Sequence, residues 1–96
     1  MPRRRPFKQH PDAQLFARAF GRALRYARQQ SGMSASSLAR GVGVYQQAVS
    51  RWETGEGLPS STSLLLIAEE TGYPLSKLFA AAERAMEKMR KQTCAK

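Results

Sequence analysis

The 96-residue sequence contains one cysteine and one histidine. The lone cysteine, Cys94, cannot close an intramolecular disulfide, which favours a reducing compartment. The only continuous aliphatic run, at residues 64–67, is far too short to span a bilayer. No apolar stretch follows the N-terminal arginines, so no secretory signal is expected. These absences predict a cytoplasmic protein without a membrane segment.

Groups that carry catalysis or bind metals are equally scarce. The histidine is His10, no carboxylate pair has a positioned basic partner, and neither a metal-ligand spacing nor a glycine-rich phosphate loop occurs. We therefore expect no enzymatic activity, no metal, no cofactor and no small-molecule ligand.

Positive charge, in contrast, is abundant. Sixteen lysines and arginines against seven acidic residues give a net charge of +9, which favours nucleic acid or an anionic membrane face as a partner. Residues 1–11, with Arg3, Arg4 and Arg5, combine cations with prolines and predict a flexible basic arm. Residues 29–60 carry no net charge.

The rest of the chain shows apolar residues at helical spacing and no strand pattern, and its length suits a single domain. Capping residues and glycines divide it into five helices. Their expected limits are, in order, Asp12 to Gly32, Ser34 to Gly41, Gln46 to Gly55, Ser60 or Ser61 to Gly72, and Leu75 to Lys91. The prediction is an all-α domain at residues 12–91, preceded by the arm at 1–11 and followed by a tail at 92–96.

The last expected helix is longer than a small core requires. Leu75, Ala82 and Met89 recur in it at seven-residue spacing, with Phe79 and Met86 between them. We expect this stripe to form the seam of a homodimer. The alternative is that the same residues complete the core of one chain.

Two of the expected helices are short and joined by a tight glycine-containing turn, the pattern of a helix-turn-helix. The segments LRYARQQSGMSASSLARGVGV, YQQAVSRWETG and LPSSTSLLLIAEETGYPLSKLF follow one another in register. From Phe20 to Phe79 the sequence resembles the lambda and 434 phage-repressor family of bacterial regulators, also called the XRE family. The resemblance implies a five-helix lambda-repressor-like DNA-binding domain.

The resemblance also implies that the helix from Gln46 to Thr54 lies in the major groove of double-stranded DNA. Gln46, Gln47 and Arg51 would then read bases, and Ser50 shares their face. A glutamine amide suits the N6 and N7 edge of adenine, and an arginine suits the N7 and O6 edge of guanine. The alternative is a solvated helix face rich in amides, which are good helix formers.

Further residues are expected to contact the DNA backbone: Tyr45, Ser34, Ser36, Arg40 and Thr54. Three positions depart from the family pattern. Ala35 replaces a glutamine that often binds phosphate, Tyr45 replaces a Ser or Thr cap, and the loop after the reading helix carries Glu56 where relatives often have cations. Affinity must then come from elsewhere. Arg3, Arg4 and Arg5 could enter an adjacent minor groove or form only a non-specific basic tail.

The family commonly has a partly buried ion pair at positions that correspond to Arg28 and Glu53. Such a pair would tie the first helix to the end of the reading helix. The alternative is two solvated surface charges, which would stabilise the fold little.

The leading functional hypothesis is a dimeric, sequence-specific transcriptional regulator, in particular a repressor, that binds an inverted-repeat operator. An antitoxin-type or anti-repressor-type protein-interaction module, which keeps the fold without base reading, is the alternative. The neutral segment 29–60 and Glu56 favour that alternative. Non-specific DNA binding by the arm alone is a third possibility.

Overall fold

The computed structural model describes residues 11–94, which form five α-helices and no strand. The helices are α1 (Pro11–Gln30), α2 (Ala35–Val42), α3 (Gln46–Thr54), α4 (Ser61–Thr71) and α5 (Leu75–Cys94). The predicted all-α, five-helix class is confirmed. Arg3, Arg4 and Arg5 lie outside the described residues, so the role of the arm stays a prediction.

Local signals set most helix ends. The hydroxyl oxygens of Ser34 and Ser60 accept hydrogen bonds from the backbone N–H groups of Ser37 (3.0 Å) and Ser63 (3.2 Å). These bonds satisfy N–H groups that lack a partner in the first turns of α2 and α4. α2, α3 and α4 each end at a glycine in the left-handed region of backbone conformation. These glycines are Gly43, Gly55 and Gly72.

Three helix limits differ from the prediction. α1 begins at Pro11, so Asp12 lies in its first turn rather than at the cap. In the first turn, a carboxylate still interacts favourably with the helix dipole. α2 runs one residue past Gly41. α5 continues to Cys94, so residues 92–94 are helical rather than part of a tail. No glycine or proline after Lys91 would interrupt the helix.

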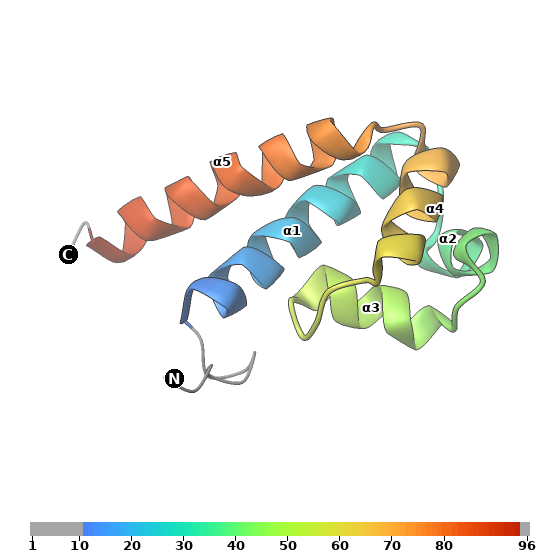
Figure 1. Ribbon diagram of the computed structural model, residues 1–96, viewed down its shortest axis with the longest axis horizontal. Coiled ribbons are helices and arrows are strands. Elements are labelled where there is room, and N and C mark those ends of the chain that lie inside the picture. The colour runs from blue at the N-terminus through green and yellow to red at the C-terminus, as the bar shows by residue number, and fades with distance from the viewer. Residues whose placement is uncertain (1–10, 95–96) are drawn as a thin grey trace, which may run out of the picture.

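α1 lies between α5 on one side and α3 on the other (Figure 1). Phe16 and Phe20 of α1 pack on Phe79 of α5, with ring centroids 6.2 and 5.7 Å apart. Ala82 and Met89, on later turns of α5, are also buried. α1 and α5, from opposite ends of the described chain, thus form one part of a core to which α2, α3 and α4 also contribute buried residues.

This burial corrects part of the expected dimer seam. Ala82 is 0% and Met89 7% exposed within a single chain, so neither is available to a second copy. Leu75 and Phe79 are partly buried against the same core, and Met86 is partly exposed. The alternative, burial in the core of one chain, holds for Ala82 and Met89. A seam at Leu75, Phe79 and Met86 stays a prediction.

α3 packs on the other side of α1, at a distance that two glycines permit. A Cβ atom at Gly21 would lie 2.7 Å from the carbonyl oxygen of Glu53, closer than real Cβ contacts come. A Cβ atom at Gly55 would lie 2.9 Å from the Cα of Arg18, and Gly55 also has a φ of +84°. The end of α3 thus rests directly on the backbone of α1.

Candidate nucleic-acid interface

The face of α3 that points away from α1 carries its polar residues. Val49 and Trp52 are buried on the inner face. The outer face lines a shallow surface depression formed by Gln46, Gln47, Ser50, Arg51, Thr54 and Glu56. Gln47 and Arg51 are one turn apart and both exposed, so they can meet the same surface. The structure thus brings together all four residues expected to read bases.

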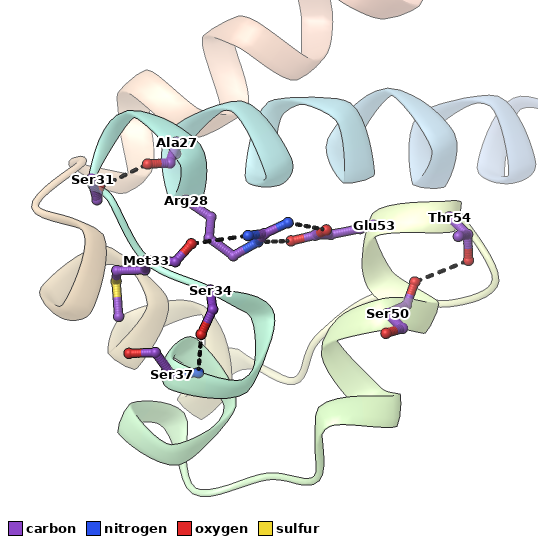
Figure 2. Close-up of polar contacts among 9 residues, drawn as sticks. All are labelled: Ala27, Arg28, Ser31, Met33, Ser34, Ser37, Ser50, Glu53 and Thr54. Carbon is purple, nitrogen blue, oxygen red and sulfur yellow. Dashed lines mark hydrogen bonds and ion pairs between the residues drawn. The ribbon is translucent and has the colours of Figure 1, made fainter.

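An ion pair between Arg28 and Glu53 joins α1 to α3 (Figure 2). Nε of Arg28 donates to Oε2 of Glu53 at 2.6 Å, and Nη2 donates to Oε1 at 3.0 Å. Nη1 donates to the carbonyl oxygen of Met33 at 2.9 Å, just before α2. The two side chains are only 13% and 9% exposed. Because the contact is bidentate, it fixes an orientation as well as a distance.

The pKa of Arg28 is raised above its usual value, mainly by the hydrogen bond to Glu53. Burial opposes this shift, and the negative charge of Glu53 adds to it. Because the folded-state pKa exceeds the unfolded one, the stabilisation is complete below the unfolded pKa and is lost only as the pH rises through the folded pKa. Both values lie far above neutrality, so the charge of Arg28 gives this contact no pH dependence near neutral pH.

The start of α3 has no side-chain cap. Tyr45 occupies the N-cap position in an extended conformation, with φ −74° and ψ 152°, and its side chain makes no capping hydrogen bond. The Tyr45 residue is 84% exposed. It lies beside Gln47, Ala48 and Arg51. Its ring and hydroxyl are therefore accessible at the edge of the outer face of α3.

The residues of α2 and its N-cap that are expected to contact phosphate are all exposed: Ser34, Ser36 and Arg40. The hydroxyl oxygen of Ser34 already accepts the capping bond from Ser37. Its proton can still be donated to an outside acceptor such as a phosphate oxygen. Arg40 makes no ion pair among residues 11–94, so its charge is not neutralised by a direct contact there.

Thr54 and Glu56 form a hydrogen-bonded pair at the C-terminal end of the outer face of α3. Oγ1 of Thr54 lies 2.9 Å from Oε2 of Glu56 and 3.0 Å and 3.2 Å from the carbonyl oxygens of Ser50 and Arg51. A hydroxyl has one proton and donates to one acceptor at a time. Three internal acceptors therefore compete with any phosphate for Thr54. Sequence spacing did not predict this pair.

α2, the turn at residues 43–45 and α3 form two helices joined by a tight connection, the geometry of a helix-turn-helix. A family model described as helix-turn-helix matches residues 24–78, more than half of the chain. The chain belongs to this helix-turn-helix family. The predicted resemblance to XRE-type regulators is thereby confirmed. Within this helix-turn-helix protein, α3 is the second helix of the motif.

Two crystal structures of the clp gene regulator ClgR from Corynebacterium glutamicum are similar to the helix-turn-helix protein. One has a TM-score of 0.80 at 25% sequence identity and covers 83% of this chain and 85% of the ClgR chain. The other has a TM-score of 0.69 at 27% identity, with 74% and 92% covered. No curated protein sequence matches the chain. The similarity extends beyond the motif to most of the five-helix fold.

The described part of the helix-turn-helix protein shows no sign of two other kinds of site. Between residues 11 and 94, no three His, Cys, Asp or Glu side chains gather where they could hold a metal ion. No helix in the same range is both long enough and apolar enough to cross a bilayer.

Proposed function

We propose that this helix-turn-helix protein is a sequence-specific transcriptional regulator that places α3 in the major groove of double-stranded DNA. The observation that carries the proposal is the outer face of α3, where amide, hydroxyl and guanidinium groups are exposed together. The helix is held from behind by buried side chains and by the Arg28–Glu53 ion pair. Family membership and the similarity to a gene regulator support DNA binding and transcriptional regulation.

The chemistry of the outer face suits base edges. Gln47 can donate to and accept from one adenine, and Arg51 can donate twice to one guanine; each such pair discriminates by about 1–3 kcal/mol. Gln46 and Ser50 extend the same face along α3. The backbone contacts are assigned to Tyr45, Ser34, Ser36 and Arg40, with a smaller part for Thr54.

Affinity must be gathered from more than one module, because residues 29–60 have no net charge. A single helix-turn-helix buries little DNA surface, so we assign binding to two copies on an inverted-repeat operator, where occupancy represses transcription. The contact between copies cannot use Ala82 and Met89 of α5, which are buried. The exposed large aliphatic side chains among residues 11–94 are Leu58 and Leu65, which are further candidates for that contact.

Gln47→Ala and Arg51→Ala should each weaken operator binding by about 10- to 100-fold, because each removes one bidentate base contact. The operator would be selected from genomic fragments in the presence of competitor DNA, and affinity measured by fluorescence anisotropy. Gln29→Ala, an equally exposed glutamine at the end of α1, should leave affinity unchanged.

If no genomic fragment stays bound in the presence of competitor DNA, base reading is contradicted. A stoichiometric protein partner found in its place would support the interaction-module alternative. Equal loss in the Gln29→Ala control would show that the effect is not specific to the face of α3.

Glu56→Gln should raise the affinity for any duplex by about fivefold at low salt. The carboxylate lies at the end of the reading face, and its repulsion of a nearby phosphate costs about 1 kcal/mol. Glutamine keeps the shape and still accepts the hydrogen bond from Thr54. Isotherms at two salt concentrations measure the change, with Glu83→Gln on α5 as the control of equal charge. A similar rise in both variants would mean that net charge, not position, is responsible.

A further inference from the structure

A second concentration of positive charge lies in a groove between α1 and α5, which we call the basic groove. It is lined by Arg22, Ala81, Arg84, Ala85, Lys88 and Gln92. Three of these six side chains are cations, and none is acidic. Arg22 belongs to α1, whereas the other five lining residues belong to α5. Only the packing of α1 on α5 therefore brings them together.

Among the described residues, the cations of the basic groove have no acidic partner. Arg22, Arg84 and Lys88 are exposed, and no ion pair among residues 11–94 involves them. The acidic residue Glu87 does not line the groove. Its Oε1 atom lies 3.8 Å from Nζ of Lys91. Cations that face one another across a concave surface repel, and they concentrate a positive potential that attracts anions.

The floor of the groove indicates which class of anion fits. Ala81 and Ala85 contribute only methyl groups, so there is no deep pocket for a large apolar side chain. An acidic peptide gains most of its affinity from such anchors, whereas a phosphate backbone needs only Lys and Arg. Arg84 and Lys88 are one turn apart, about 6 Å along the helix, and can contact successive groups of a regular polyanion.

The basic groove is separated from the reading face. α5, which supplies five of its six lining residues, lies across α1 from α3 (Figure 1). The outer face of α3 points away from α1, since its inner face carries Val49 and Trp52. DNA bound along α3 therefore leaves the α5 wall of the groove uncovered.

We propose that the basic groove binds the phosphate backbone of a second DNA duplex without reading its sequence, so that the protein bridges two DNA segments. This activity goes beyond operator reading by α3, because it requires only that the groove hold phosphate. The groove lies outside the neutral segment 29–60 and would hold the second duplex independently of the operator.

The test compares two triple variants of equal charge. The groove variant carries Arg22→Gln, Arg84→Gln and Lys88→Gln, and the control carries Lys77→Gln, Arg90→Gln and Lys91→Gln, all exposed on α5 outside the groove. Operator DNA is fixed to beads, the protein is added, and recovery of a labelled duplex without an operator is measured. The groove variant should recover at least about tenfold less labelled duplex than the wild type. The slope of log K against log salt concentration for the labelled duplex should fall in magnitude by up to about 3.

Thermal unfolding and operator binding of the groove variant should stay at wild-type values. If the groove variant recovers as much labelled duplex as the wild type, the proposal is overturned, and bridging would be assigned to the two reading helices of a dimer. An equal loss of recovery in the control variant would also overturn the proposal. Binding of a poly-glutamate peptide in preference to DNA would overturn it in favour of an acidic protein partner. The Gln47→Ala/Arg51→Ala double variant should still bind the labelled duplex, so failure of base reading remains distinguishable from failure of the groove.

Discussion

Gly21→Ala should destabilise the protein by about 2 kcal/mol, although alanine is the better helix former. In an unobstructed helix the change would gain about 1 kcal/mol. Here the new Cβ would meet the carbonyl oxygens of Trp52 and Glu53, the latter at 2.7 Å. Both are backbone atoms and cannot rotate aside, so α1 and α3 must separate. The shift in the urea midpoint at constant m-value measures the loss.

Gly41→Ala is the matched control, because Gly41 is also helical and the change in propensity is the same. A Cβ there would meet the side chain of Glu70, which is exposed and free to swing toward solvent. We expect Gly41→Ala to be neutral or to stabilise by up to about 1 kcal/mol. Shifts of the same sign and size in the two variants would show that close backbone approach does not set the tolerance at Gly21.

Arg28→Met should destabilise the protein by about 3 kcal/mol. The substitution keeps much of the side-chain volume but leaves the carboxylate of Glu53, 9% exposed, without its cation. It also removes the hydrogen bond to the carbonyl oxygen of Met33. Chemical denaturation near neutral pH measures the loss, and operator affinity should fall with it because the bidentate contact orients α3.

The double variant Arg28→Met/Glu53→Leu separates charge from packing. Replacing both members of a buried ion pair by apolar residues is often close to neutral for stability. We therefore expect the double variant to recover most of the lost free energy of unfolding, apart from the bond to Met33. If the single and double variants unfold at the same urea concentration, the unpaired carboxylate is not the cause of the loss.

Most helix ends could be predicted from the sequence, because capping residues and terminating glycines act through local interactions. Ser34 and Ser60 bond to amides three residues along, and Gly55 ends α3 where its left-handed backbone requires it. Such interactions depend on neighbours in the chain and not on the fold. The start of α1 and the end of α5 were misplaced because neither carries a strong signal.

The role of the α5 stripe could not be read in the same way. A periodic apolar face shows that something covers a helix, but not what covers it. Phe79 packs on Phe16 and Phe20, which lie at the other end of the described chain. The seven-residue spacing favoured a second copy, whereas α1 covers Phe79 in the fold.

The shared exposed face of Gln46, Gln47, Ser50 and Arg51 was predictable from helical spacing, whereas their role in base reading stays a prediction. The close approach at Gly21 was not predicted, although an isolated glycine inside a helical pattern is a recognised signal of tight packing. The pair between Thr54 and Glu56 and the basic groove depend on side-chain positions and on contacts between distant helices. Sequence spacing alone does not report either.

The central place of α1 has a consequence for how the protein is made. α1 is the first of the described helices to leave the ribosome, and α5 is the last. Phe16 and Phe20 therefore have no lasting cover until the C-terminal helix has been synthesised, and a chain stalled before Phe79 exposes an aromatic surface that favours aggregation. α3 packs on α1 before that point, so a nascent chain can hold α3 in place before α5 has joined the core.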